Sequence, residues 1–352
     1  MRVAESANIS SKTSSQSRLP DLKPKEKLGL YRQMLLIRHF EEKAKQAFTQ
    51  GKIKGFCHLY NGQEAVAVGT ISVLNDDDAV ITAYRDHGHA LARGVDPNAC
   101  MAELFGKITG CSRGKGGSMH FFDAKKHFYG GHGIVGGQIP LGTGLAYAQK
   151  YLGTNRVTLA YMGDGAINQG AIHESMNLAA LWKLPIIYII ENNEYSMGTS
   201  IARSSAGDPL TKRAGAFDMA AIQANGMDID DVRARTHEAV SLARTESLPT
   251  LMEIRTYRYL GHSMSDPGHY RSKEEIQDRR QNDPIELYKA RLLEQRVATE
   301  ESLNALDEEV MAQTQAAYDF AENSAEPEIE TVFEDIFSPE DQIAEFQPDR
   351  HA

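Results

Sequence analysis

The chain has 352 residues, of which 41% are hydrophobic and 24% are charged, a composition typical of a globular protein rather than a disordered or coiled-coil chain. Its 38 basic and 48 acidic side chains leave a formal charge of −10, and no block of five Lys or Arg residues offers the basic face that nucleic-acid binding needs. The longest strongly apolar run, 184–190, is far shorter than the roughly 20 residues of a membrane span. We therefore expect a soluble protein that binds neither nucleic acid nor membrane.

The elements follow one another in an alternating pattern. Leu30, Met34 and Ile37 recur with the helical period and predict an amphipathic helix over 26–50. Further along, β-rich segments alternate with predicted helices; the strands are 79–82, 157–162, 186–190 and 251–256, and the helices are near 62–73, 138–151, 168–183 and 230–245. Strands separated by helix-length intervals indicate βαβ crossovers, so we predict a parallel sheet with helices on both faces.

Other stretches carry less order. Residues 198–215 and 261–272 are predicted to be long loops, and helical periodicity returns over 284–321. Residues 1–20 are rich in serine and lack the apolar core of a secretory signal. We divide the chain into a flexible N-terminal segment (1–25), an α/β domain (26–321) and an acidic C-terminal tail (322–352).

The cysteines form no recognisable site. Cys57, Cys100 and Cys111 are an odd number without C-x-x-C spacing, so the sequence favours neither a disulfide framework nor a zinc site. We expect a reducing compartment.

One βαβ unit places two polar residues at the same edge of the predicted sheet. The strand 157–162 runs into Gly163-Asp164-Gly165, and the strand 186–190 runs into Asn192-Asn193. Because the two strands end at one edge, where open α/β sheets bind ligands, Asp164 and Asn193 should lie close together. A carboxylate, an amide oxygen and a carbonyl from the turn after Asn193 suit Mg²⁺, with phosphate oxygens completing its shell. The flanking glycines let a diphosphate approach the backbone.

This segment resembles the alpha subunits of pyruvate dehydrogenases, within the thiamine-diphosphate-dependent 2-oxoacid dehydrogenase family. Gly163-Asp164-Gly165 with Asn192-Asn193 is similar to the thiamine diphosphate signature of that family. Further motifs match in the same order between residues 26 and 337; they are 55–64 (GFCHLYNGQE), 82–85 (TAYR), 113–120 (RGKGGSMH), 168–170 (NQG), 179–185 (AALWKLP) and 256–268 (TYRYLGHSMSDPG).

The resemblance implies a fold and a set of site residues. The fold is the thiamine-diphosphate-binding α/β fold, a three-layer α/β/α sandwich around a mostly parallel sheet. Mg²⁺ would be held by the side chains of Asp164 and Asn193 and by the backbone carbonyl of Tyr195. The positions that match contacts to thiamine diphosphate are Tyr84, Arg85, Gly133, Val135, Gly165, Ala166 and His262. Arginine suits such a site because it clamps phosphate through two N–H groups.

Two histidines carry the proton chemistry that the resemblance implies. His58 and His262 match active-site histidines, and this side chain exchanges protons near neutral pH. We assign no chemical role to the other ten histidines, among them His87, His89 and His120.

The implied activity is that of an oxidoreductase with a disulfide acceptor. Pyruvate would be decarboxylated to CO₂, and its acetyl group passed to the lipoyl group of dihydrolipoamide acetyltransferase for acetyl-CoA synthesis. The cofactor of this family lies between two domains, of which this chain supplies one, so the resemblance implies a separate beta subunit and an α2β2 heterotetramer.

Alternative functions are a branched-chain 2-oxoacid or acetoin dehydrogenase alpha subunit, or an inactive scaffold subunit. We favour pyruvate because 164–200 and 256–268 follow the pyruvate pattern. We favour an active enzyme because Asp164, Asn193, Arg85 and His58 are all present.

Leu260 departs from the mitochondrial pattern, which has a second histidine there. This favours a bacterial-type protein of the cytoplasm, with the mitochondrial matrix or a plastid as alternatives. Ser263 and Ser200 match positions that are phosphorylated in mitochondrial relatives, and because of Leu260 we expect both to be unmodified. The loops 198–215 and 261–272 are expected to order over the cofactor.

A second glycine motif, Gly131-His-Gly133-Ile-Val-Gly136, fits the dinucleotide pattern G-x-G-x-x-G. We predict no dinucleotide site there, because no clear strand precedes the motif and no Asp or Glu between 137 and 158 could bind a ribose.

The negative charge is concentrated in the tail. Residues 322–352 contain ten acids and one base, whereas the other 321 residues contain 38 acids and 37 bases. The tail also has apolar residues, and we predict that part of it packs on a neighbouring subunit through Ile329, Val332, Phe333, Ile336 and Phe337.

Overall fold

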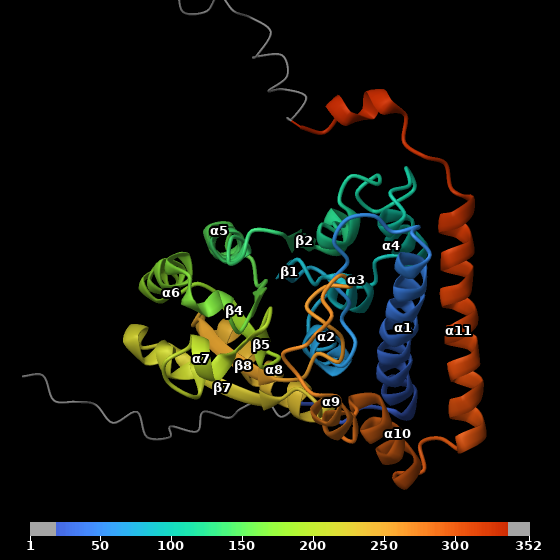
Figure 1. Cartoon of the computed structure of the whole chain (residues 1–352). Helices are drawn as coiled ribbons and strands as arrows, with labels where there is room; N and C mark the ends of the chain where they lie inside the picture. Colours follow the sequence, from blue (N-terminus) through green and yellow to red (C-terminus); the bar gives the residue numbers. More distant parts are fainter. Residues whose placement is uncertain (1–18, 337–352) are drawn as a thin grey trace, which may run out of the picture.

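The computed structural model describes residues 19–336, arranged as helices around a central sheet (Figure 1). The expected flexible segment 1–25 therefore lies mostly outside the described residues, as does Phe337. The helices are α1 (Pro24–Thr49), α2 (Glu64–Ile71), α3 (His87–Ala92), α4 (Pro97–Leu104), α5 (Gln138–Tyr151), α6 (Gly170–Trp182), α7 (Ile201–Ser204), α8 (Ile229–Glu246), α9 (Lys273–Arg280), α10 (Pro284–Glu294) and α11 (Glu300–Asn323). The strands are β1 (Ala79–Ala83), β2 (Phe128–His132), β3 (Thr158–Gly163), β4 (Ile186–Asn192), β5 (Tyr195–Ser196), β6 (Thr199–Ser200), β7 (Ala220–Asn225) and β8 (Thr250–Arg255).

Six of the strands form one sheet in the order β2-β1-β3-β4-β8-β7, and every neighbouring pair is parallel. The predicted parallel sheet is thus confirmed, and the four predicted strands are β1, β3, β4 and β8. The chain passes from β1 outward to β2 and then returns past β1 to β3, so the strand order reverses between β1 and β3. In open α/β sheets, ligands bind at the carboxyl ends of the strands beside such a reversal.

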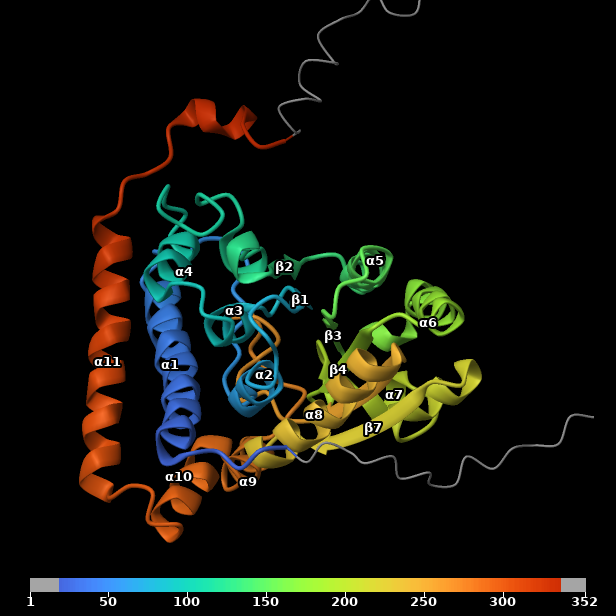
Figure 2. The same cartoon turned by 180° about the vertical axis from the view of Figure 1, so that it is seen from behind.

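Side chains of the central strands alternate between two apolar cores. Leu159 and Tyr161 of β3 belong to the core shared with α1, α2 and α8, whereas Ala160 and Met162 belong to the core shared with α5 and α6. All four are completely buried, as expected for a strand covered on both faces. The result is the expected three-layer arrangement, in which α5 and α6 lie on the opposite side of the sheet from α2 (Figure 2).

Two strands of the sheet, β2 and β7, were not predicted from the sequence. β2 contains Gly130 and Gly131, and β7 has alternately buried and exposed residues at the edge of the sheet. A Cβ at Gly131 would lie 2.1 Å from the Asp86 carboxylate, so glycine is required where β2 passes this side chain. The expectation that no strand precedes the motif 131–136 is therefore wrong, because glycine is required for packing here and hides the strand signal.

The C-terminal helices pack on α1. The periodicity predicted over 284–321 is divided at residues 295–299, where Arg296 adopts a positive φ of 54° and Thr299 caps the next helix by accepting the Ser302 N–H at 3.3 Å. α11 then runs alongside α1 in both views (Figures 1 and 2). None of the helices between residues 19 and 336 is both long and apolar enough to span a membrane.

Candidate active site

Five parallel strands deliver the predicted site residues to one edge of the sheet. Tyr84 and Arg85 follow β1, Gly133 follows β2, Asp164 follows β3, Asn193 follows β4, and the segment with His262 follows β8. Because these are the carboxyl ends of the strands beside the reversal between β1 and β3, residues up to 178 positions apart meet there.

Two of the three predicted metal ligands share one hydrogen-bond donor, and the third lies near the same charge. A single guanidinium nitrogen, Nη1 of Arg258, donates to Asn193 Oδ1 at 3.2 Å and to the Tyr195 carbonyl at 3.1 Å. Burial raises the pKa of the Asp164 carboxyl to about 6, and the Arg258 charge offsets part of this shift. A cation of the protein thus already lies against this set of oxygens, so the set has the geometry and the charge to hold a positive ion.

Secondary contacts orient these ligands. Asn193 Nδ2 donates to Gln63 Oε1 at 3.1 Å, which turns the amide oxygen toward Arg258. Ser196 Oγ donates to Asp164 Oδ2 at 3.2 Å, and a Cβ at Gly165 would lie 2.2 Å from that hydroxyl. Gly165 is therefore needed for the close approach of the loop after β4 to the turn after β3.

Two buried arginines have no carboxylate partner within residues 19–336. Arg85 donates to the carbonyls of Leu59 and His262, both at 2.7 Å, and Arg258 donates to the carbonyl and amide oxygens given above and to the Tyr270 hydroxyl. Burial and the nearby Arg258 charge lower the pKa of Arg85 to about 10. Two buried guanidinium groups that form no ion pair among the described residues still have donors to offer, so this region is suited to a bound anion.

The two predicted catalytic histidines lie beside Tyr84. The His58 and His262 rings are 5.3 Å apart between centroids, and Tyr84 lies 4.7 Å from His58. The Tyr84 hydroxyl and His262 Nε2 are 3.5 Å apart. Both Nδ1 atoms are buried without a hydrogen-bond partner in the described part of the chain, as expected of side chains that await a ligand.

Burial and positive charge keep these histidines neutral. Burial, followed by the charge of Arg85, lowers the pKa of His58 to about 2 and that of His262 to about 4. At neutral pH each ring therefore has one nitrogen that donates and one that accepts, which allows it to give or take a proton without adding a third positive charge.

The remaining predicted cofactor residues lie on the loops that follow β2 and β3. Gly165 and Ala166 follow Asp164 on the turn that leads to α6, and Gly133 and Val135 lie between β2 and α5, where Val135 is 45% exposed. No contact among the described residues joins Gly133 or Val135 to the histidines or to the oxygen set.

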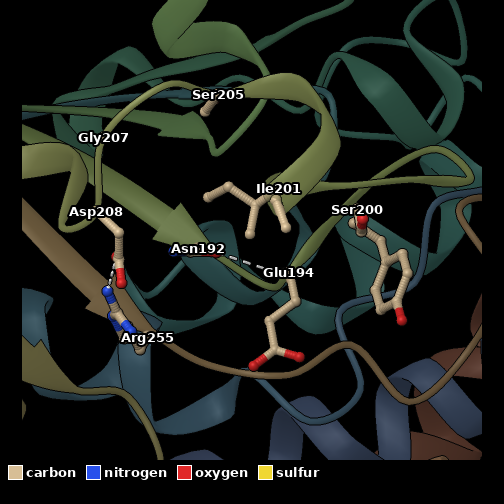
Figure 3. Close-up of a pocket in the computed structure, with 10 residues that line it drawn as sticks. Asn192, Glu194, Ser200, Ile201, Ser205, Gly207, Asp208 and Arg255 are labelled. Atoms are coloured by element: carbon tan, nitrogen blue, oxygen red, sulfur yellow. Dashed lines mark hydrogen bonds and ion pairs between the residues drawn. The ribbon is translucent and has the colours of Figure 1, made fainter.

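A cavity of about 330 Å³ lies beside the turn at residues 192–195 (Figure 3). It is bounded by the loop after β4 and by α7, and an ion pair between Asp208 and Arg255 closes one side. Asn192 lines it and accepts the Glu194 N–H at 3.2 Å, which shapes the turn that presents Asn193 and Tyr195 to the other side. The cavity therefore borders the site without containing the histidines.

Arg258 is the main site residue that the sequence analysis did not assign. It lies within the quoted motif 256–268, three residues after β8 ends, and only 2% of it is exposed. Asp164 follows β3 directly, whereas Arg258 lies three residues beyond β8, so only a search of the whole segment after each buried strand would have found it.

Comparison with known proteins agrees with this geometry. The profile of the family described as "Dehydrogenase E1 component" matches residues 32–330, most of the chain. The chain belongs to the dehydrogenase E1 component family. A Rhizobium meliloti protein named pyruvate dehydrogenase E1 component subunit alpha is 53% identical over 319 residues, which are 90% of this chain and 92% of the relative.

Further relatives of this E1 component bear the same name. The Zymomonas mobilis protein is 50% identical over 313 residues, 88% of each chain. The human protein, named as the somatic mitochondrial form of the alpha subunit, is 49% identical over 313 residues, 88% of this chain and 79% of its own. The matched range of the E1 profile includes every candidate site residue named above.

Proposed function

We propose that this chain is the alpha subunit of a pyruvate dehydrogenase component, which decarboxylates pyruvate oxidatively and transfers the acetyl group to a lipoyl group of dihydrolipoamide acetyltransferase. The observation that carries the proposal is the pair of buried arginines without carboxylate partners, Arg85 and Arg258, beside three converging oxygens. That arrangement fits a diphosphate held together with a divalent cation.

The fit to thiamine diphosphate and Mg²⁺ assigns a role to each group. Asp164, Asn193 and the Tyr195 carbonyl would hold the metal, and Arg85 with Tyr84 would hold the diphosphate. The lining of the site would come from Gly133, Val135, Gly165, Ala166 and His262. When bound, thiamine diphosphate supplies the electron sink for decarboxylation. The chain itself binds the anion and orients it beside His58, which is buried, and His262, which is half-buried.

His58 and His262 are proposed to hold and move the protons of acetyl transfer. Both are neutral, and each has a buried Nδ1 without a partner among the described residues. We expect His262→Ala to slow acetyl transfer to lipoamide by about 10²-fold or more, the usual range for loss of a proton-transfer group. Cofactor affinity, measured by tryptophan fluorescence, should change by less than about tenfold, because the variant loses at most one hydrogen bond to the cofactor. Transfer at the wild-type rate would remove His262 from the site.

The metal site should depend on pH through Asp164. Burial raises the pKa of this carboxyl to about 6, so below pH 6 it binds a proton and loses the negative charge that attracts Mg²⁺. We expect Mg²⁺ affinity to be about tenfold lower at pH 5 than at pH 7.5, as measured by titration calorimetry. The Asp164→Asn variant should show no such dependence. Equal affinities of the wild type at both pH values would contradict the assignment.

A second subunit is proposed to complete the site, and an exposed apolar face supports this. The α5–α6 surface consists of Ile134, Val135, Leu141, Tyr147, Tyr151, Leu152, Leu181 and Trp182, each more than 40% exposed. Tyr147 stacks with Tyr151 and lies 5.4 Å from Trp182 between ring centroids. Lys150, on the same helix, donates to two carbonyls at the end of α6. Such a surface beside Gly133 suits an apolar partner, the beta subunit of an α2β2 heterotetramer.

The tail offers a second contact of this kind. Arg113 forms ion pairs with Glu334 and Asp335, which hold residues 329–336 against the loop after α4. The apolar residues there remain uncovered, with Phe333 77% exposed. Packing of this segment on a neighbouring subunit stays a prediction, as does a cytoplasmic location.

Co-expression with a beta subunit tests the proposed function. The assembled enzyme should reduce an artificial electron acceptor with pyruvate, and it should acetylate a free lipoyl domain. Preference for branched-chain 2-oxoacids or for acetoin would assign one of the alternative activities, and the absence of turnover with all of them would indicate a scaffold subunit.

Limited proteolysis tests the docking of the tail. Cleavage of the tail at equal rates in free and assembled protein would contradict its docking.

A further inference from the structure

The segment that carries His58 is held by side chains from distant parts of the chain. Residues 57–60 have no strand partner, and each backbone position makes one long-range hydrogen bond. These bonds join the Cys57 carbonyl to the Met264 N–H (2.8 Å), the His58 N–H to Ser118 Oγ (3.0 Å), the Leu59 carbonyl to Arg85 Nη1 (2.7 Å) and the Tyr60 N–H to Glu41 Oε1 (2.9 Å).

Two of these holding groups are connected to each other through His87. His87 Nδ1 lies 2.9 Å from Glu41 Oε2, and His87 Nε2 lies 2.9 Å from Ser118 Oγ and 3.0 Å from the Ser118 carbonyl. Glu41, His87 and Ser118 are at most 4% exposed and come from α1, α3 and the glycine-rich loop before β2. They form a continuous buried chain that ends at the His58 backbone.

The Glu41 carboxylate favours the protonated form of His87. Burial alone would lower the pKa of His87, but the charge of Glu41 and its hydrogen bond raise that pKa above its ordinary value. In the protonated form, which the raised pKa favours, both ring nitrogens of His87 carry hydrogen and Nε2 donates to Ser118. The Ser118 oxygen then accepts from His87 and from the His58 N–H, while the hydroxyl also hydrogen-bonds the Cys57 thiol.

This arrangement is not that of a hydrolytic triad, although Glu, His and Ser follow one another. Ser118 is 4% exposed, and His87 and Glu41 are completely buried, so no substrate reaches the hydroxyl. The Ser118 hydroxyl is already engaged by His87 Nε2 and by the His58 N–H, so it is not available to attack a substrate.

We propose that Glu41, His87 and Ser118 are positioning residues that fix the His58 ring against His262 and Tyr84 for proton movement. The inference rests on the role proposed above for His58. Ser118 acts directly by holding the His58 backbone N–H, and Glu41 acts twice, by holding the Tyr60 N–H and by binding His87 Nδ1. A displacement of about 1 Å in a reacting group can reduce a rate by about 10²-fold, so a backbone clamp this close to the ring has a measurable effect.

A double-mutant cycle in the enzyme assembled with its beta subunit and loaded with thiamine diphosphate tests this. Ser118→Ala should reduce kcat for acetyl transfer to a free lipoyl domain by about tenfold, since it removes one hydrogen bond, and leave KM for pyruvate unchanged. In the His58→Ala background the same substitution should reduce kcat by less than about twofold, because its effect passes through His58. Ser175→Ala is the matched control, since this buried hydroxyl donates only to the Ala171 carbonyl within α6.

Two further measurements do not depend on turnover. Hydrogen–deuterium exchange of a peptide that covers residues 57–60 should be faster in Ser118→Ala than in the wild type and unchanged in Ser175→Ala. Glu41→Gln keeps an oxygen for the Tyr60 N–H but removes the charge that pairs with His87, and it should also lose kcat only where His58 is present. This variant replaces Ser118→Ala if the latter fails to fold.

The outcomes separate the inference from the proposed function. If His58→Ala transfers acetyl groups at the wild-type rate, the role of His58 is wrong and the inference is overturned with it. If His58→Ala transfers acetyl groups slowly, but Ser118→Ala reduces kcat by the same factor in the wild-type and His58→Ala backgrounds, the proposed function stands and the inference alone is overturned. The inference would also be overturned if Ser118→Ala showed the wild-type rate of hydrogen–deuterium exchange at residues 57–60 and the wild-type rate of acetyl transfer.

Discussion

Replacement of Asp164 by alanine should abolish Mg²⁺-dependent binding of thiamine diphosphate to the assembled enzyme. Asp164 supplies the one carboxylate of the three converging oxygen groups, so its loss removes the only formal negative charge among the proposed metal ligands. We expect cofactor affinity to fall by about 10²-fold or more, because removing a charged partner in a buried site costs about 3 kcal/mol or more. Tryptophan fluorescence and titration calorimetry with and without Mg²⁺ measure this.

Two control variants separate the loss of the Asp164 charge from a loss of the fold and from a change in net charge. Asp164→Asn has the shape of the carboxylate without its charge and should lose nearly as much affinity as Asp164→Ala. Asp218→Asn removes an exposed carboxylate at the amino end of β7 and should bind the cofactor like the wild type. An unchanged thiamine diphosphate affinity in Asp164→Ala would mean that the metal lies elsewhere.

A single charge on the α5–α6 surface should abolish activity by preventing assembly. Leu141 is 53% exposed on α5, and a glutamate there needs no rearrangement in the free chain. In an apolar interface the same carboxylate is buried without a partner, at a cost of several kcal/mol. We expect Leu141→Glu to remain folded and monomeric by sedimentation analysis and to show less than about 1% of wild-type turnover when mixed with the beta subunit.

The control for this prediction lies on the opposite side of the molecule. Met311 is 43% exposed on α11, and Met311→Glu should assemble and turn over pyruvate normally. The wild-type chain without its partner should show no turnover, because the histidines and the arginines hold only one side of the cofactor. Turnover by the isolated chain, or assembly by Leu141→Glu, would show that the surface is not needed.

Much of the framework can be read from local patterns. The strands β1, β3, β4 and β8 are runs of apolar and β-branched residues, and buried parallel strands need such runs on both faces. The convergence of Asp164 and Asn193 followed from one rule, that parallel strands of a βαβ unit end at one edge. The strands β2 and β7 could not be predicted in this way. Glycine is required in β2 because the strand passes close to the Asp86 side chain, and β7 has exposed residues because it lies at the edge of the sheet.

By itself, the sequence determined four of the six strands of the sheet, which residues follow them and which family the motifs resemble, because these depend on neighbours within about 30 residues. Only the tertiary structure decided that Arg258 lies against the Asn193 and Tyr195 oxygens, that Arg85 is buried without a carboxylate partner among the described residues, and that Glu41, His87 and Ser118 hold the His58 segment. The last contacts join residues 31 to 60 positions apart across α1, α3 and a glycine-rich loop. No local pattern encodes such distances, and a buried polar group has a partner only after the elements have packed together.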